Sequence, residues 1–130
     1  METKKNGTVL NVLVVDEMVA HFALLKSNYP QEEDKQVHFF SKFKLEDLSD
    51  FIDHREIKLV IFFVYGRRSL HKLLPFLGFD LEIILFTNER DLWWLSESLP
   101  QVNVVDLALP KAQLLNVVED VIQGLRTKDE

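Results

Sequence analysis

Five short apolar runs, each followed by a segment with helical spacing, alternate along this chain. The runs cover residues 8–16, 36–40, 58–65, 81–87 and 102–107. Strands and helices that alternate in this way build right-handed β-α-β units and a parallel sheet covered on both faces. The runs 58–65 and 81–87 are continuously apolar, as expected of central strands buried on both sides. The pattern predicts an α/β fold with a five-stranded parallel sheet and five flanking helices.

The spacing of apolar residues marks the expected helices. They run from Met18 to Leu25, around Leu45 to Ile52, from Leu70 to Leu77, from Asp91 to Leu99 and from Pro110 to Leu125. Pro75 lies inside the third helix, where a proline removes one hydrogen bond and kinks the rod. Pro110 is well placed at the start of the last helix, because proline is favoured at the first helical position.

The length, net charge and composition of the chain limit the class of protein. A chain of 130 residues suits one domain, residues 1–130, with an ordered core over about residues 8–126 and flexible ends. The net charge of −6 argues against direct binding of nucleic acid, which usually requires a basic stripe. The sequence has no cysteine, no leader-like start and no apolar run of the roughly 20 residues that span a membrane. A cytoplasmic protein that does not contact membranes is expected.

The residues at the carboxyl ends of the strands indicate a family. Ligands of open α/β sheets bind beyond these ends. The stretches VLVVDE (12–17), LVIFF (59–63), IILFT (83–87) and DLALP (106–110) carry the end residues here. In this order they resemble the receiver domain of bacterial two-component response regulators, over nearly the whole chain. The resemblance implies a flavodoxin-like sheet with strand order 2-1-3-4-5.

The phosphorylation site of that family is degenerate in this sequence. In receiver domains the third strand presents the phosphorylated aspartate, and a lysine precedes the proline after the fifth strand. The aspartate position falls on Phe63, with Phe62 or Val64 as the result of a one-residue shift. The lysine position is Leu109, and the aromatic switch position corresponds to Asp106. The resemblance is therefore to an atypical receiver, or pseudo-receiver, that cannot form an acyl phosphate.

Three residues match the family pattern. Asp16 and Glu17 correspond to the acidic pair that holds Mg²⁺, and Thr87 corresponds to the Thr or Ser that ends the fourth strand. Two adjacent acids are a minimal set for octahedral Mg²⁺, so only a weak acidic remnant is expected. Alternatively, Asp16 caps the helix that follows it, with Glu17 favoured by the helix dipole. Thr87 can equally serve only to end its strand.

Two arginines follow the third strand and are expected on the lip of the same crevice. Arg67 or Arg68 could pair with Asp16 or Glu17 in place of the missing cation, because a guanidinium meets a carboxylate bidentately. The alternative is that both arginines are solvated loop residues.

No constellation of catalytic residues is visible. The four histidines, His21, His38, His54 and His71, lie on separate elements without the paired spacing of a zinc site. The sequence has no phosphate-binding glycine loop and no nucleophile elbow. We therefore expect no enzyme activity, no cofactor and no metal.

The sequence is compatible with three functions. The first is a phosphorylation-independent signalling module that binds a protein partner or itself. The second is a small-ligand sensor that uses the apolar crevice beside Phe62, Phe63 and Tyr65, and the least favoured is a flavodoxin-like enzyme. The chain could also be the receiver part of a longer transcription regulator.

The segment RDLWWLSESL (90–99) suggests where a partner would bind. Leu92, Leu95 and Leu99 share one helical face, so Trp93 and Trp94 cannot both point inward with them. At least one tryptophan is expected to be exposed, and tryptophan is enriched at binding hot spots. Receiver domains commonly dimerise through the fourth helix, fifth strand and last helix. The resemblance thus implies a homodimer or partner interface centred on Trp93 and Trp94, with Asp106 in the contributing segment 106–112.

Overall fold

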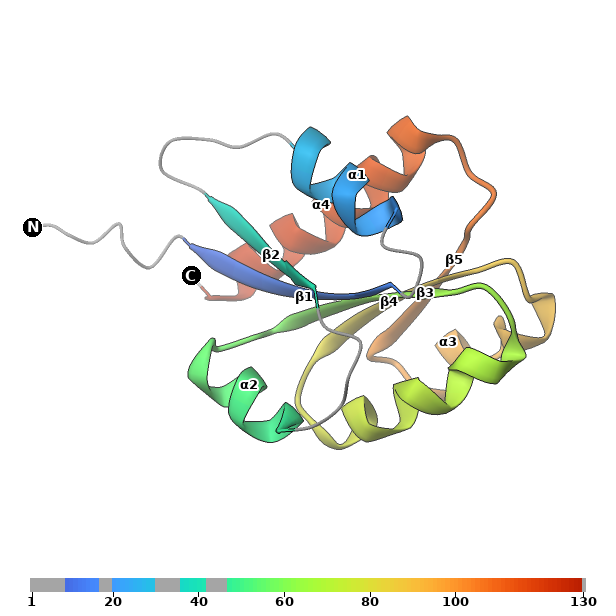
Figure 1. Ribbon diagram of the computed structural model, residues 1–130, viewed down its shortest axis with the longest axis horizontal. Helices are drawn as coiled ribbons and strands as arrows, with labels where there is room; N and C mark the ends of the chain where they lie inside the picture. Colours follow the sequence, from blue (N-terminus) through green and yellow to red (C-terminus); the bar gives the residue numbers. More distant parts are fainter. Residues whose placement is uncertain (1–8, 17–19, 30–35, 42–46, 130) are drawn as a thin grey trace, which may run out of the picture.

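The structure is a computed structural model, and it describes residues 9–16, 20–29, 36–41 and 47–129, with the backbone alone at 67–70 and 127–129. A twisted parallel sheet forms the middle layer, with helices above and below it (Figure 1). Its strand order is β2-β1-β3-β4-β5, and all four neighbouring pairs are parallel. The predicted flavodoxin-like α/β fold is confirmed.

The elements follow the predicted order. The strands are β1 (Leu10–Asp16), β2 (Val37–Ser41), β3 (Leu59–Val64), β4 (Glu82–Thr87) and β5 (Val102–Asp106). The α-helices are α1 (Ala20–Asn28), α2 (Leu48–His54), α3 (Leu95–Ser98) and α4 (Lys111–Asp129), and the 3₁₀ segments include η2 (Arg67–Gly78) and η3 (Arg90–Leu92). With η3 and α3 taken together, five helical segments flank the sheet. The expected starts of the first two helices, at Met18 and Leu45, lie outside the described residues.

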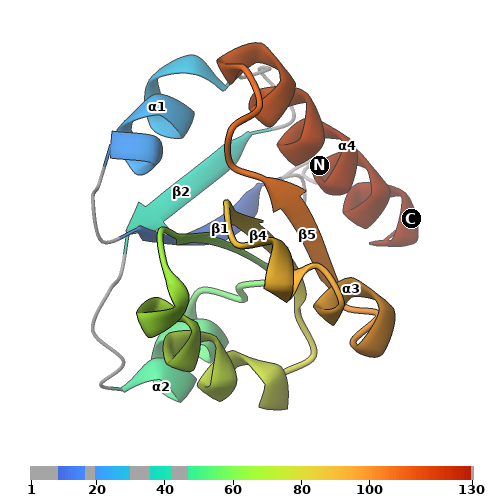
Figure 2. The same cartoon turned by 90° about the vertical axis from the view of Figure 1, so that its right-hand side faces the viewer.

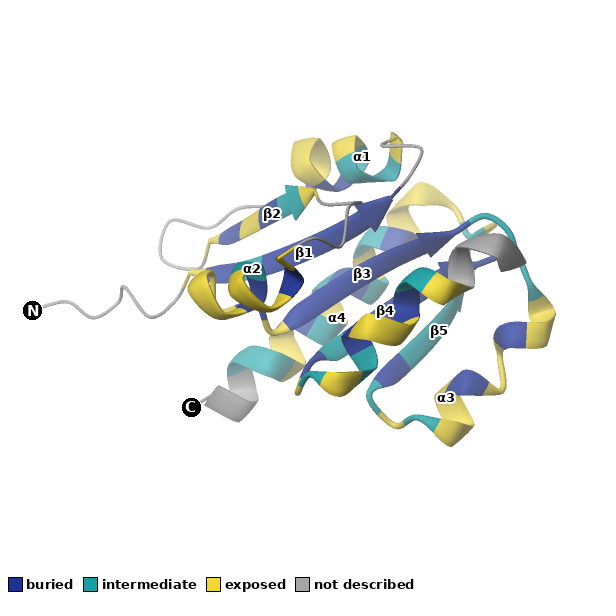
Figure 3. Ribbon diagram, turned by 60° about the horizontal axis from the view of Figure 1, so that its bottom comes forward, coloured by how far each residue is buried: buried dark blue, intermediate teal, exposed yellow. Residues whose placement is uncertain are grey.

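Burial separates the central strands from the edge strands. Every residue of β3 is buried, and in β4 only Glu82 is partly accessible. β2 alternates between buried and accessible positions, and four of the five residues of β5 are half-buried. Figure 3 shows this contrast as an unbroken buried colour along β3. The continuously apolar runs therefore mark central strands, as the sequence predicts.

Each face of the sheet has its own hydrophobic cluster. On one face α1 and α4 cover the sheet, and on the other lie α2, η2 and the η3–α3 segment (Figure 2). Side chains of the first cluster, from strands and helices, are Val12, Val14, Leu25, Ile61, Phe63, Ile84, Phe86, Leu114, Val118 and Ile122. The second cluster includes Val15, Ile52, Val60, Phe62, Val64, Leu73, Phe76, Leu85 and Leu95. Successive residues of β3 alternate between these clusters, as the two-residue period of a strand requires.

Two of the expected helices differ in kind from the prediction. The segment 67–78 is a 3₁₀ helix with Pro75 inside it, rather than an α-helix. Proline has no N–H to donate, so the helix lacks one backbone hydrogen bond at that point, as the sequence predicts, but this does not by itself select the 3₁₀ form. The segment 91–99 is not one continuous helix, because η3 ends at Leu92 and the single turn of α3 begins at Leu95.

Candidate functional site at the carboxyl ends of the strands

Asp16 is the buried acid at this edge of the sheet, with no exposed surface. Its Oδ2 accepts hydrogen bonds from the backbone amides of His21 (2.8 Å) and Phe22 (3.1 Å) in the first turn of α1. Its Oδ1 accepts a hydrogen bond from the Tyr65 hydroxyl at 2.5 Å. The carboxylate thus satisfies first-turn amides of α1 that have no intrahelical partner, but these amides lie five and six residues along the chain rather than the two or three of the expected N-cap.

His21 joins the same cluster through its ring. Its Nδ1 lies 2.8 Å from the Tyr65 hydroxyl oxygen. A phenol has one hydrogen, which Tyr65 gives to Asp16, so its oxygen can only accept from the imidazole. The hydrogen-bond chain therefore places a proton on Nδ1 of His21. The result is a chain of two hydrogen bonds, from the imidazole to the phenol and from the phenol to the buried carboxylate.

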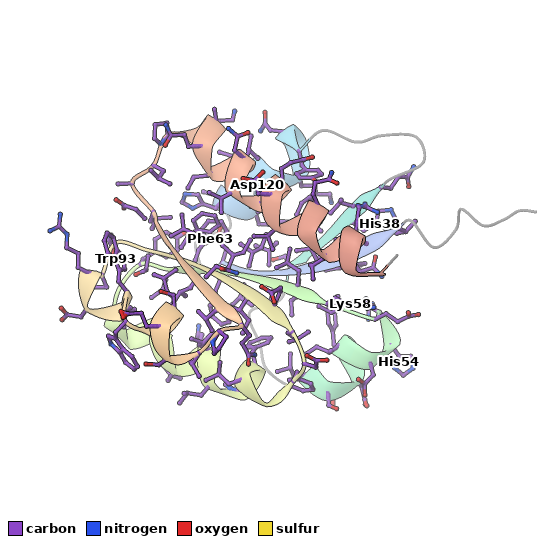
Figure 4. All side chains as sticks on the ribbon, turned by 180° about the vertical axis from the view of Figure 1, so that it is seen from behind. His38, His54, Lys58, Phe63, Trp93 and Asp120 are labelled. Carbon is purple, nitrogen blue, oxygen red and sulfur yellow. The ribbon has the colours of Figure 1, made fainter. Side chains whose placement is uncertain are left out.

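Phe63 is the residue that the expected resemblance to receiver domains assigns to the phosphoacceptor position. Its ring stacks on His21 on one side, with centroids 4.5 Å apart, and on Phe86 on the other, at 5.0 Å. Only 3% of Phe63 is exposed, and Figure 4 shows it between the sheet and the α1/α4 layer. Phe63 pairs in register with Asp16, so both side chains leave the sheet on the same face. Stacked rings therefore fill the region beside the carboxylate.

Thr87 does not join this cluster. It is fully buried and pairs in register with Val64, whose side chain belongs to the opposite face from Phe63. Its Oγ1 accepts a hydrogen bond from the amide of Glu89 at 3.0 Å. Thr87 therefore shapes the turn after β4, which agrees with the interpretation that it ends its strand.

The last residue of β5 and the loop after it also make local contacts. Leu109 is half-buried against the cluster under α1 and α4, so this residue, at the position that the expected resemblance assigns to a lysine, makes an apolar contact. Asp106 Oδ1 accepts a hydrogen bond from the Ala108 amide at 2.9 Å, which tightens the turn. Asp106 and Leu109 thus support the loop between β5 and α4.

Some expected contacts fall outside the described part of the chain. Glu17 is not among the described residues, and the side chains of Arg67 and Arg68 are not described either. Among the described residues, no group of three or more His, Asp or Glu side chains could hold a metal ion. The expected pairing of an arginine with the acidic pair therefore remains a prediction.

Both tryptophans of the 90–99 segment are exposed. Trp93 is 45% exposed and Trp94 is 55% exposed, whereas Leu92 and Leu95 beside them are buried. This confirms that the leucines face the sheet and that at least one indole does not. Figure 4 places Trp93 at the outer end of the molecule, near the carboxyl ends of the strands and away from the core.

Sequence reasoning missed the roles of His21 and Tyr65. In the sequence, His21 is one of four dispersed histidines, and Tyr65 indicates only the lining of an apolar crevice. Tyr65 lies two residues after Phe63, so the strand period predicts that both face the same side. A polar group at that position, on the face of a buried acid, is the signal that could have found the pair.

Among the helices that the structure describes, none is long and apolar enough to cross a bilayer.

Comparisons with known proteins identify no relative of this chain. No family model, curated protein or solved structure matches this chain.

Proposed function

We propose that this protein is a receiver-like module that acts in signalling by binding another protein, without phosphorylation and without enzyme activity of its own. The observation that carries the proposal is the exposure of two adjacent tryptophans, Trp93 and Trp94, at 45% and 55%. A large indole is costly to leave in water and contributes strongly when a partner covers it. A protein surface centred on these residues is the binding site that we infer.

The closed site at the sheet edge supports independence from phosphorylation. A phosphoryl group needs a carboxylate nucleophile, and Phe63 stands where the receiver pattern has one. The acid that would hold Mg²⁺, Asp16, accepts hydrogen bonds from Tyr65 and from the first turn of α1. A partner that binds the surface around Trp93 and Trp94 would therefore not need phosphorylation at this site to make that surface available.

The partner in this proposal is a protein, and the location is the cytoplasm. The net charge of −6 opposes attraction to nucleic acid and to anionic lipid surfaces. Asp91 and Glu97 are exposed acids within the same segment as the tryptophans. Arg90 of the same segment is exposed as well, so the apolar centre has a rim of mixed charge, which fits a partner with an apolar pocket edged by side chains of both signs.

The test compares binding by three variants. The immobilised protein is used to capture a partner, which is identified by mass spectrometry and then titrated against each purified variant. Trp93→Ala or Trp94→Ala should weaken binding by about thirtyfold, the usual effect of losing a hot-spot residue. Val9→Ala is the matched control, because Val9 is 41% exposed but precedes β1 at the opposite end of the strands.

Circular dichroism confirms that each variant is folded. If both tryptophan variants bind every captured partner as tightly as the wild type, the proposed surface is wrong.

A further inference from the structure

β5 is the edge strand whose surroundings the structure describes in full. β4 lies on one side of it, and no described element pairs with the other side (Figure 2). The opposite edge, β2, is flanked by residues 30–35 and 42–46, which lie outside the described part of the chain. The backbone groups that an edge leaves unpaired can therefore be identified at β5.

The hydrogen-bond pattern shows which residues of β5 face outward. In a parallel sheet, the N–H and C=O of one residue point to the same neighbouring strand, and those of the next residue point away. The amide of Ile83 donates to the carbonyl of Gln101, and the amide of Leu107 donates to the carbonyl of Thr87. These two bonds fix the alternation along β5. The outward-facing residues are Val102, Val104 and Asp106.

Local bonds use two of the six outward groups. The Val102 amide donates to the Leu99 carbonyl at 2.9 Å, and the Asp106 carbonyl accepts from the Leu109 amide at 3.3 Å. Four groups have no hydrogen-bond partner within the described part of the chain. They are the Val102 carbonyl, the amide and carbonyl of Val104, and the Asp106 amide.

These four groups are complementary to a copy of themselves. We propose that two copies of this chain pair through β5, antiparallel, about a two-fold axis at Val104. Val104 then faces Val104 of the second copy, and the two residues exchange two hydrogen bonds. The Asp106 amide of each copy donates to the Val102 carbonyl of the other. Every unpaired outward group finds a partner, and no locally bonded group is needed.

The side chains of β5 suit this register. Val104 is half-buried and β-branched, and β-branched pairs facing each other across antiparallel strands are favourable. Asn103 would face Val105 of the second copy, and both are half-buried. Asp106 would lie opposite Val102, so the two acidic side chains do not face each other. β5 also contains neither Lys nor Pro, the residues that commonly protect a natural edge from pairing.

This inference rests on the proposed role in protein association and adds a partner, a second copy, and a contact, the backbone of β5. A two-fold contact of this kind closes on itself and leaves no β5 edge open. It requires neither Trp93 nor Trp94, so the two surfaces can be tested separately.

Sedimentation equilibrium of the purified chain tests the pairing with two substitutions at one position. Val104→Pro removes the outward amide, which has no partner within the described chain, and an outward-facing proline is tolerated in an edge strand. The wild type should dimerise, and Val104→Pro should weaken the dimer by about thirtyfold, because two intermolecular hydrogen bonds are lost. Val104→Ala is the matched control. It trims the side chain but keeps the amide, so it should dimerise much more strongly than Val104→Pro.

Amide hydrogen exchange gives a second measurement that needs no variant. The amides of Val104 and Asp106 should become protected as the protein concentration rises through the dimerisation range. The amides of Asn103 and Val105 point toward β4 and should be protected at every concentration, so they serve as internal controls.

The outcomes separate this inference from the proposed function. A dimer that survives Trp93→Ala and Trp94→Ala but is lost with Val104→Pro supports β5 pairing. A dimer that is lost only with the tryptophan variants overturns β5 pairing and leaves the tryptophan surface standing. A wild type that stays monomeric, or whose Val104 amide is protected only when a foreign protein is added, also overturns it.

Discussion

The Tyr65 hydroxyl donates a hydrogen bond to the buried carboxylate of Asp16 at 2.5 Å, although 49 residues separate the two along the chain. This bond joins the end of β1 to the residue that follows β3. Because the same carboxylate accepts two amides of α1, it ties a helix and the ends of two neighbouring strands together. The acid that the receiver pattern assigns to a metal therefore has a structural role in this fold.

Tyr65→Phe should lower the free energy of unfolding by about 1–3 kcal/mol, measured by urea denaturation. The substitution keeps the ring but removes the hydroxyl, which leaves Oδ1 of a fully buried Asp16 without this donor. The cost is the desolvation of a charged group that has lost a hydrogen bond.

A double-mutant cycle with Asp16→Ala attributes the effect to this pair. The two substitutions together should cost less than the sum of the single effects, with a coupling of about 1 kcal/mol or more. Additive effects would show that the hydroxyl and the carboxylate stabilise the fold independently.

Sub-millimolar Mg²⁺ should leave both the tryptophan fluorescence and the thermal midpoint unchanged. Asp16 gives its oxygens to Tyr65 and to the first turn of α1, and Mg²⁺ binds tightly only with near-octahedral oxygen ligands. Ca²⁺ at the same ionic strength controls for general salt effects. A saturable response specific to Mg²⁺ would show that the acidic pair is a working site.

Incubation with acetyl phosphate and Mg²⁺ should add no phosphate to the chain, as measured by intact mass. The resemblance to receiver domains assigns the phosphoacceptor position to Phe63, which has no carboxylate to accept a phosphoryl group. The rings of His21 and Phe86 stack on Phe63. A receiver domain with an intact aspartate is the positive control. A stoichiometric adduct that hydroxylamine removes would overturn the assignment of this position.

Glu56→Gly should stabilise the protein by about 1 kcal/mol. Glu56 has φ 51, the left-handed conformation, and follows the end of α2. The amides of Glu56 and Ile57 donate back to the carbonyls of Asp53 and Ile52, which is the bonding pattern of a Schellman helix end. Glycine adopts this conformation without the steric cost that a Cβ imposes.

Glu56→Ala is the matched control for that substitution. Alanine also removes the carboxylate but keeps the Cβ, so its unfolding midpoint in urea should not rise as that of Glu56→Gly does. If both variants are equally stabilised, loss of the charge rather than the backbone conformation is responsible.

The sequence predicts the layers of this fold better than its polar contacts. Continuous apolar runs such as 58–65 identify central strands, because burial on both faces removes the need for polar residues. The stripe of Leu92 and Leu95 likewise predicts that Trp93 and Trp94 cannot both be buried. These inferences need only the period of one element and the apolar character of its residues.

The bond between Tyr65 and Asp16 depends on how separate elements come together. It requires β1 and β3 to be neighbours in a register that pairs Asp16 with Phe63, and it requires α1 to bring His21 over the ring of Phe63. The spacing within the third strand places Tyr65 on the same face as Phe63, but it does not show which strand and which helix lie beside that face. Pro75 likewise predicts an interruption of the helix over 67–78 but not the 3₁₀ form that the segment adopts.

The position of α4 has a consequence for biosynthesis. This helix of 19 residues is the last described element of the chain, yet Leu114, Val118 and Ile122 complete the cluster that contains Ile84 and Phe86. A nascent chain can pair all five strands and still expose the part of that apolar sheet face that α4 covers until α4 has left the ribosome. Partly folded chains with such surface are prone to aggregate. A pause in translation while α4 is still inside the ribosome should therefore make the protein most dependent on chaperones.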